Sequence, residues 1–160
     1  MKQRKNIISV AIDSPAASGG GTQAKLISKH YSLLNVNTGA LYRIIGKLKL
    51  ENPKKFGYSL VKKKIKKLKI KDLENKNLFS DEIANSASII AKDEKIRKLV
   101  HNFQINCAYN PPKKYKGSCL EGRDIGSVIL PSADFKFFLT ATTKTRALRR
   151  YKELKRKNKK

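Results

Sequence analysis

Acidic residues are scarce in this sequence. It has 12 aspartates and glutamates against 37 lysines and arginines in 160 residues, which gives a formal net charge of +25. Such a chain attracts anions, so nucleotides, nucleic acid and acidic membrane surfaces are the partner classes to consider. The alternative is that lysine is simply the favoured surface residue, because most basic residues are lysines and they are scattered. Charge alone leaves both interpretations open.

Cysteines are few, and long hydrophobic runs are missing. Cys107 and Cys119 have neither the spacing of a metal site nor the companions of a disulfide framework. The apolar run near the N-terminus is followed at once by Asp13 and Pro15, which favours a buried strand over a signal peptide. No run is long enough to span a bilayer, and no internal repeat is visible. We therefore expect one cytoplasmic, monomeric domain with no membrane partner and no specific nucleic-acid partner.

The hydrophobic pattern predicts an α/β fold with a doubly wound parallel sheet and helices on both faces. Strands are expected at residues 6–12, 33–36, 117–121 and 135–139. Helices are expected at 22–31, 38–50, 80–91 and 93–109, and from Thr142 or Thr143 into Lys160. Ala24, Leu26 and Ile27 should form the buried stripe of the first helix, and Thr38 should cap the second.

Residues 51–80 differ in character from the stretches around them. Pro53 and Gly57 break the helical pattern, and residues 62–71 form a basic amphipathic stretch. We interpret 51–80 as an inserted, mobile subdomain. A nucleic-acid-binding helix is the alternative, but aromatic stacking partners and base-reading groups are lacking nearby. The chain ends within a basic helix with no closing strand after it, which suggests an incomplete protein.

A loop of small residues between the first strand and the first helix predicts a phosphate site. Small side chains let backbone N–H groups converge on phosphate oxygens, and the helix N-terminus adds positive potential. The last residue, Thr22, is placed to give its hydroxyl to Mg²⁺. The candidate ATP-binding residues are Ser14, Pro15, Ala16, Ala17, Ser18, Gly19, Gly20, Gly21 and Thr22. A glycine-rich turn without a ligand is the alternative.

This loop departs from the pattern G-x-x-x-x-G-K-[ST]. Ser14 stands at the first glycine, Gly20 stands where the phosphate-binding lysine is expected, and Gly21 is one residue extra. We therefore expect ATP to bind but turnover to be low, with Gly20→Lys raising kcat more than ATP affinity. A relocated arginine, Arg146 or Arg150, is the competing possibility.

Three further segments are informative: residues 37–43, 82–88 and 120–126. Together they carry a resemblance to the cytidylate kinase family of P-loop nucleoside monophosphate kinases. Asn37-Thr-Gly-Ala-Leu-Tyr-Arg43 resembles the family's Asp-Ser-Gly-Ala-hydrophobic-Tyr-Arg signature, and Leu120-Glu-Gly-Arg-Asp-Ile-Gly126 resembles its Asp-Gly-Arg-Asp-hydrophobic-Gly segment. Residues 82–88 resemble its helix with a base-recognition serine. The likeness runs from the first strand to the last residue, about three quarters of a typical member. It implies phosphoryl transfer from ATP, with Mg²⁺, to CMP or dCMP.

The resemblance also implies an organisation of the chain. Residues 1–50 would hold the P-loop and the first half of the core, and 51–80 the inserted subdomain that binds the monophosphate. Residues 81–142 would complete the core, and 143–160 would begin a lid that is apparently truncated.

For the acceptor phosphate, the resemblance implies contacts from Thr38, Arg43, Arg97 and Arg123, because a guanidinium can pair with phosphate through two hydrogen bonds. A solvated helix charge is the alternative for Arg97. The catalytic residues would be Arg123 and the lid arginines Arg146 and Arg150, while a solvated basic helix is the alternative for the lid.

For the cytosine base, the resemblance implies contacts from Ser88 and Asp124. A carboxylate acceptor at Asp124 would favour the amino group of cytosine over O4 of uracil, which is itself an acceptor. The alternatives are a small residue packed between helices for Ser88 and a turn salt bridge with Arg123 for Asp124.

The chain departs from the family at further positions. Asn37 replaces an acid, Glu121 replaces an Asp that could organise Mg²⁺ through water, and the rest of the lid is absent. Three rival hypotheses remain: a non-catalytic nucleotide-binding protein of this fold, another nucleotide kinase, and a basic RNA-binding protein.

Overall fold

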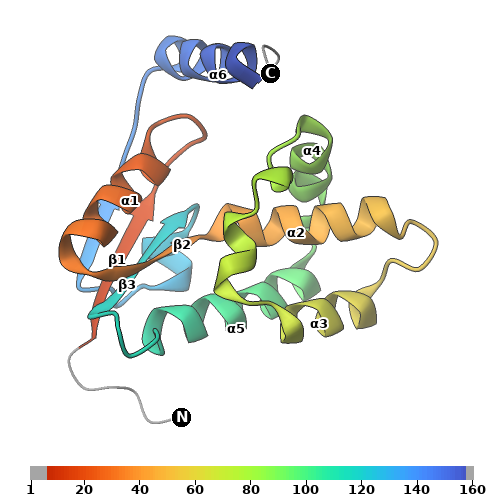
Figure 1. Cartoon of the computed structure of the whole chain (residues 1–160), viewed down its shortest axis with the longest axis horizontal. Helices are drawn as coiled ribbons and strands as arrows, with labels where there is room; N and C mark the ends of the chain where they lie inside the picture. The colour runs from red at the N-terminus through yellow and green to blue at the C-terminus, as the bar shows by residue number, and fades with distance from the viewer. Residues whose placement is uncertain (1–6, 158–160) are drawn as a thin grey trace.

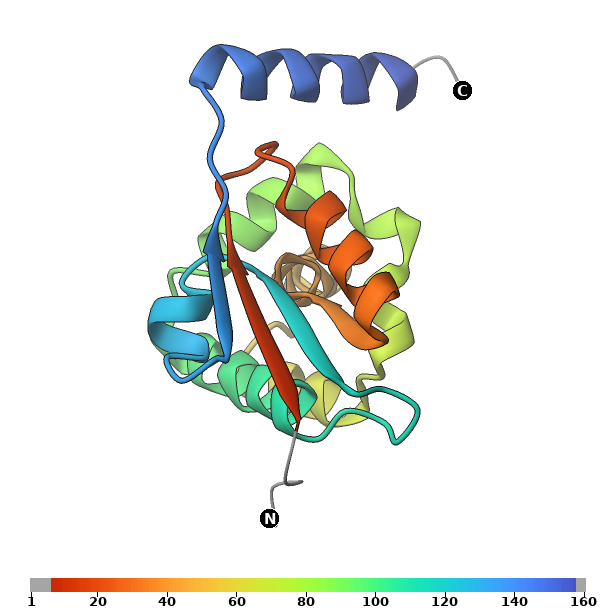
Figure 2. The ribbon, with the colours of Figure 1, turned by 90° about the vertical axis from the view of Figure 1, so that its left-hand side faces the viewer.

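A computed structural model describes residues 7–157 of the chain. Its sheet has four parallel strands within that range, in the order β2-β3-β1-β4 (Figure 2). The strands are β1 (Ile8–Asp13), β2 (Leu33–Asn37), β3 (Gly117–Gly122) and β4 (Phe135–Phe138). The predicted α/β class with a parallel sheet is confirmed.

Successive side chains of each strand point to opposite faces of the sheet, and each face is buried in its own apolar cluster. This is expected for a parallel sheet covered on both sides. One face packs against α1, and the other packs against α2 and α5 (Figure 1). Val10 and Ile12 face α1, whereas Ala11 between them belongs to the cluster on the opposite face. Two-sided burial explains why the strands read as continuous hydrophobic runs.

The helices lie mainly on one side of the sheet, with α2, α3, α4 and α5 grouped beside it (Figure 1). Their bounds are α1 (Gly20–Tyr31), α2 (Thr38–Glu51), α3 (Tyr58–Lys67), η1 (Ile70–Glu74), η2 (Lys76–Leu78), α4 (Asp81–Ile90), α5 (Glu94–Tyr109), η3 (Ile125–Ile129) and α6 (Thr143–Lys157). Val61, Leu73 and Leu78 are buried in the same cluster as residues of α2 and α5. Residues 58–78 therefore share their core with the helices around them.

Polar side chains fix where three helices begin, because they accept otherwise unpaired N–H groups of the first turn. Asn37 Oδ1 accepts from Ala40 N at 3.0 Å, so Asn37 caps α2 and the expected cap at Thr38 is wrong. Ser80 and Asp93 cap α4 and α5 in the same way.

Other differences from the sequence-based prediction follow from tertiary packing. α1 begins at Gly20, two residues earlier than expected, and Leu26 is 57% exposed rather than buried. Ala24 is fully buried, so the apolar stripe of α1 is narrower than its hydrophobic residues suggest. The basic stretch at 62–71 is not one helix, because α3 ends at Lys67 and η1 follows.

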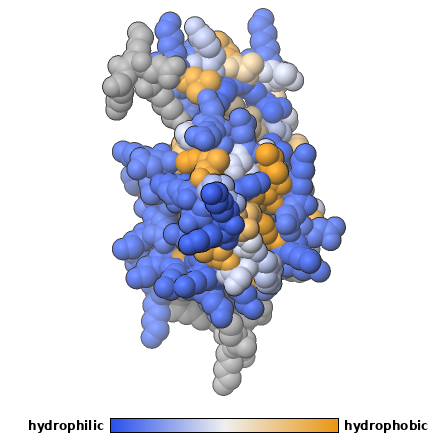
Figure 3. Space-filling model, turned by 90° about the vertical axis from the view of Figure 1, so that its right-hand side faces the viewer, coloured by the Kyte–Doolittle hydropathy of each residue, from blue (hydrophilic) through white to orange (hydrophobic). Residues whose placement is uncertain are grey.

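The two chain segments after η3 lie at the margin of the fold. β4 forms an edge of the sheet, and its four residues are all exposed. α6 lies beyond the strand ends, over the loop between β1 and α1 (Figures 1 and 2). On the face drawn in Figure 3, hydrophilic side chains cover much of the surface around smaller hydrophobic patches. Among the described residues, no helix combines the length and apolarity needed to cross a membrane.

Candidate active site

The carboxyl ends of the parallel strands gather the predicted site segments at one edge of the sheet. Asp13 at the end of β1 is in register with Gly122 of β3 and Phe138 of β4, and Asn37 of β2 is in register with Glu121 of β3. The loop at 14–19, the start of α2 and the turn after β3 therefore lie side by side. Open α/β sheets bind ligands in such a position.

The phosphate-loop candidates form a curved backbone that leads directly into α1. Ala17 and Gly19 both have left-handed backbone angles, with φ of 62° and 104°. Left-handed angles in a tight loop help to turn N–H groups towards one concave side, which suits an anion. Thr22 lies exposed in the first turn of α1, where its hydroxyl is accessible. The whole predicted segment thus forms one loop and helix start.

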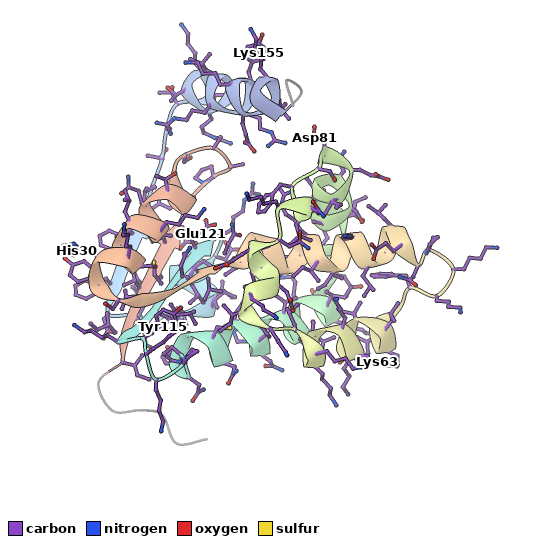
Figure 4. All side chains as sticks on the ribbon, viewed as in Figure 1. His30, Lys63, Asp81, Tyr115, Glu121 and Lys155 are labelled. Atoms are coloured by element: carbon purple, nitrogen blue, oxygen red, sulfur yellow. The ribbon has the colours of Figure 1, made fainter. Side chains whose placement is uncertain are left out.

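Glu121 places a carboxylate beside this loop (Figure 4). Its oxygens lie 3.5 Å and 3.6 Å from the positions that Cβ atoms on Gly21 and Gly20 would occupy. Burial raises the pKa of Glu121, and the positive charge of Lys25 partly opposes that rise. A carboxylate held this way, close to the Thr22 turn, suits a bound cation.

The turn after β3 is held by a residue that the sequence analysis did not single out. Asp13 Oδ1 accepts the N–H of Ile125 at 2.6 Å, and Oδ2 accepts that of Gly126 at 2.8 Å. Asp124, just before them, has a left-handed φ of 59°. The sequence signal that could have identified Asp13 was an acidic residue at the end of a buried strand, directly before the loop.

Arg97 and Asp124, predicted for the acceptor site, are brought together from α5 and the turn. Arg97 Nη2 lies 3.7 Å from Asp124 Oδ2, and Arg97 Nη1 donates to the carbonyl of Ala91 at 3.4 Å. Tyr42 of α2 is half-buried beside this pair; burial raises the pKa of its hydroxyl, and Arg97 opposes the rise. The ion-pair partner of Asp124 is therefore Arg97, while Arg123 is exposed.

Arg43 and Thr38, on α2, are anchored by backbone carbonyls. Arg43 Nη1 donates to Leu78 O at 3.1 Å, and its guanidinium lies 5.2 Å from the centre of the Phe79 ring. Burial lowers the pKa of Arg43, and the nearby charge of Arg150 lowers it further. The buried hydroxyl of Thr38 donates to Glu121 O at 2.9 Å. Arg43 thus lies between the η2 segment and α6.

Arg146, Arg149 and Arg150, all on α6, have different partners. Arg146 Nε donates to Ala16 O at 2.8 Å, and Arg149 Nη1 donates to Ala17 O at 3.2 Å and to Ser18 O at 2.9 Å. Arg150 instead pairs with Asp81 at the start of α4 and with Glu153. Figure 4 shows Asp81 at the end of α4 that lies towards α6. Arg146 and Arg149 therefore lie against the loop at 14–19, whereas Arg150 lies against the start of α4. The catalytic roles expected for Arg146 and Arg150 stay predictions.

Comparison with known proteins settles the family. A sequence model described as cytidylate kinase matches residues 10–160 of the chain. The chain belongs to the cytidylate kinase family. It is 40% identical over 151 residues to the cytidylate kinase of Bartonella tribocorum, covering 92% of this chain and 67% of that protein. It is 39% identical over 145 residues to that of Azorhizobium caulinodans, covering 91% and 68%, and 37% identical over 162 residues to that of Clostridium botulinum, covering 94% and 72%.

As a member of the cytidylate kinase family, the chain carries two linked departures in its phosphate loop. A Cβ on Gly20 would overlap Ser14 Oγ and would lie 2.9 Å from Ser14 Cβ. The side chain of Ser14 therefore fills the space that a residue larger than glycine at position 20 would need. The serine at the first glycine position and the glycine at the lysine position fit each other.

The serine that the cytidylate kinase resemblance assigned to base recognition lies on the surface of α4. Ser88 is exposed, and its hydroxyl donates to Asn85 O at 2.7 Å. The small residue packed between helices is instead Ser86, which is buried and donates to Gly46 O at 3.1 Å. The contact of Ser88 with cytosine stays a prediction, and the structure does not bring Ser88 into contact with Asp124.

Proposed function

We propose that this site transfers the terminal phosphoryl group of ATP to CMP or dCMP, giving ADP and CDP or dCDP. The observation that carries the proposal is the meeting of two candidate anion sites at one sheet edge. The phosphate loop lies on one side, and the pair formed by Arg97 and Asp124 lies on the other, in a chain of the cytidylate kinase family. Two nucleotides bound there would have their phosphates between the strand ends.

The donor side uses the loop and the start of α1. The left-handed angles at Ala17 and Gly19 support an N–H cradle for the phosphates of ATP, and the N-terminus of α1 adds its dipole. Arg146 and Arg149 reach the outer carbonyls of the same loop from α6. In this proposal, their positive charge stabilises the charge that spreads over the phosphates during transfer.

The acceptor side uses Arg43, Arg97 and Arg123. The phosphate of CMP is already ionised near neutral pH, so the attack needs no strong general base. Catalysis then rests on holding donor and acceptor in line and on stabilising charge in the transition state. Arg43 is pre-positioned by Leu78 O and Phe79, and Arg97 by Ala91 O and Asp124. Ordered guanidinium groups lose less freedom when a phosphate binds.

Thr22 and Glu121 fit a Mg²⁺ ion that arrives with ATP. Mg²⁺ prefers oxygen ligands and usually keeps phosphate and water ligands beside one or two protein groups. Among residues 7–157, no cluster of three or more His, Cys, Asp or Glu residues suited to a metal occurs. When bound, the ion would neutralise charge on the phosphate oxygens. Thr22 would offer a hydroxyl, and Glu121 would orient metal-bound water.

Base selection would fall to Asp124, whose turn is fixed by Asp13. In this proposal the Asp124 carboxylate accepts the cytosine amino group, and Arg97 holds the carboxylate in place. Ser88 would contribute from the surface of α4 if the base extends that far. The monomeric state and cytoplasmic location expected from the sequence also remain part of the proposal.

The test is ATP-dependent formation of nucleoside diphosphate by the purified chain, with CMP, dCMP, UMP, AMP and GMP compared as acceptors. Diphosphate formation from CMP or dCMP well above the other three supports the proposal. ATP binding without any diphosphate product would support the non-catalytic alternative, and preference for another acceptor would identify a different nucleotide kinase. Retention of RNA binding at high salt would favour the RNA-binding alternative, because binding driven by charge alone weakens steeply with salt.

A further inference from the structure

A groove of about 450 Å³ lies beside the start of β2. Its walls come from three parts of the chain: α1 with the first residues of β2, the η1 segment, and the loop before β3. β2 is an edge strand, so no further strand of residues 7–157 covers this side of the sheet. Figure 4 shows Tyr115, from the loop before β3, towards the end of the molecule away from α6. Among the described residues, the groove shares no wall residue with the phosphate loop or with the turn at Asp124.

Three lysines give this β2 groove a positive charge. Lys25 and Lys29 lie four residues apart on α1, so they project from the same face of the helix and repel each other. Lys114 lines the groove from the loop before β3, with its ammonium group 5.0 Å from the centre of the Tyr115 ring. Within residues 7–157, no carboxylate lies within ion-pair distance of any of these lysines. An anion bound in the groove would offset their repulsion.

Two buried polar atoms in the groove walls also lack partners. Ser28 is 5% exposed, and in the described part of the chain its Oγ has no hydrogen-bond partner of normal geometry. Its neighbour is the thiol of Cys119, which is a weak hydrogen-bonding group. Asn35 Oδ1 is likewise buried and unpaired among those residues. An unpaired buried polar atom costs free energy, so a ligand that supplies both an acceptor and a donor would be favoured here.

The chemistry of the walls selects the class of ligand. Lysine ammonium groups bind phosphate as point charges, and the Ser28 hydroxyl can donate to a phosphate oxygen. The Asn35 carbonyl and the Glu74 carboxylate are acceptors, so hydroxyl groups of a ligand can donate to them, whereas a bare anion cannot. Ile70 is half-buried and adds an apolar wall suited to a carbon skeleton. The volume of the groove is also within the usual range for small-molecule sites.

We propose that the β2 groove binds a sugar phosphate, that is, a phosphate monoester whose carbon skeleton carries hydroxyl groups. The phosphate would lie among the three lysines and accept from Ser28, while the sugar hydroxyls would donate to Asn35 and Glu74. A free sugar phosphate and the ribose phosphate part of a nucleotide share this chemistry. The groove is separate from the proposed kinase site, so this inference does not depend on phosphoryl transfer.

The experiment measures binding of ribose 5-phosphate, inorganic phosphate and CMP to the full chain at physiological salt. Calorimetry gives the affinities, and backbone amide chemical shifts locate each bound ligand. Lys29→Ala/Lys114→Ala removes two charges from the groove. Lys62→Ala/Lys63→Ala is the matched control, because it removes the same charge from the exposed surface of α3.

A third variant separates ligand binding from folding. Ser28→Ala removes the buried hydroxyl that has no partner of normal geometry among the described residues. Melting curves without ligand are recorded for this variant and for wild type. The melting temperature should stay unchanged or rise, because an unpaired buried group is removed, while the affinity for ribose 5-phosphate should fall by about tenfold. A serine with a merely structural role would instead lower the melting temperature.

Ribose 5-phosphate should shift the amide signals of residues 28–35 and 114–116, and it should bind more tightly than inorganic phosphate. The groove variant Lys29→Ala/Lys114→Ala should weaken its binding by about tenfold or more, the equivalent of losing one hydrogen bond to a charged group. The control on α3 should change the affinity by less than about twofold, because charges outside a binding site act weakly at physiological salt.

The inference is overturned if ribose 5-phosphate does not saturate the chain, if the groove and control variants weaken binding equally, or if the shifts are confined to residues 14–22 and 124–126. Equal affinity for inorganic phosphate would overturn the assignment of a hydroxyl-bearing ester. If CMP shifts the same groove amides, the ligand class includes nucleotides; if only ribose 5-phosphate does, the ligand is a free sugar phosphate. None of these measurements needs diphosphate formation, so failure of the proposed kinase function is detected separately.

Discussion

The carboxylate of Asp13 ties the end of β1 to Ile125, 112 positions later in the chain, through a hydrogen bond of 2.6 Å. The second oxygen of Asp13 accepts from Gly126. These bonds fix the turn that carries Arg123 and Asp124 against the strand that leads into the phosphate loop. The proposed donor and acceptor sides of the site therefore share one carboxylate.

Asp13→Asn should weaken both stability and CMP use. The amide offers a single oxygen to two backbone donors, and hydrogen bonds to charged groups contribute about 1.5–3 kcal/mol. We expect a loss of about 1–3 kcal/mol in unfolding free energy and a lower kcat/KM for CMP. Asp134→Asn is the control, because Asp134 also accepts from a backbone N–H and a hydroxyl, but at Ser9. The proposed role of the turn is wrong if both variants change kcat/KM for CMP equally.

Asp124→Asn should reduce the preference for CMP over UMP. The ratio of kcat/KM for the two acceptors should fall by a factor equivalent to about 1–3 kcal/mol, the scale of losing a hydrogen bond to a charged group. The loss of the ion pair with Arg97 should add a general decrease for both acceptors. Steady-state kinetics with each acceptor separate the two effects. Glu82→Gln is the surface control. If the ratio of kcat/KM for CMP over UMP in Asp124→Asn is the same as in wild type, Asp124 does not select the base.

Arg43→Lys should lower kcat/KM for CMP by about tenfold to a hundredfold, because an ammonium group cannot reproduce the guanidinium fork. The substitution also loses the donor to Leu78 O and the stacking on Phe79. Affinity for ATP should change little. Lys47→Arg, one turn further along α2, is the matched control and should leave both parameters near wild type. A folded Arg43→Lys protein with normal CMP kinetics would contradict the assignment.

Glu121→Gln should change how stability depends on pH. Burial raises the pKa of Glu121 above its ordinary value of 4.5, so the folded protein binds this proton more tightly than the unfolded chain does. The wild type therefore gains stability at low pH and loses it as pH rises through the raised pKa. Relative to wild type, the glutamine variant should become more stable as pH rises from 4.5 and then reach a plateau. Urea unfolding of both proteins at several pH values measures the difference in unfolding free energy. A difference that does not change with pH would contradict the prediction.

Gly20→Lys alone should destabilise the loop. Its Cβ would overlap Ser14 Oγ, and forced overpacking of this kind costs about 1–3 kcal/mol. Adding Ser14→Gly should recover most of that loss, because it removes the conflicting side chain. The sequence alone suggested that the single substitution raises kcat; the packing indicates that this gain needs the double variant. A double-mutant cycle in unfolding free energy provides the measurement, and simple additivity would contradict the coupling.

Much of the fold followed from local patterns. The buried runs around Ala11 and Leu120 predicted parallel strands, since two-sided burial removes polar alternation. Ser80 and Asp93 marked the starts of α4 and α5 because their side chains satisfy first-turn N–H groups. The prediction that Leu26 is buried was wrong. Helical spacing shows which residues share a face of the helix, but not how much of that face the sheet will cover.

The sequence by itself determined the kind of site: a small-residue loop between a strand and a helix, arginines in motifs further along, and no lysine at Gly20. Only the tertiary structure decided which side chains meet. Neighbouring residues of a helix point about 100° apart, so the docking of α6 turned Arg149 to the loop and Arg150 to Asp81. In the same way, the meeting of Ser14 with Gly20 and of Asp13 with Ile125 depends on chain curvature and strand register. Local propensities do not encode these contacts, because the packing of the whole fold sets the distance between the atoms that meet.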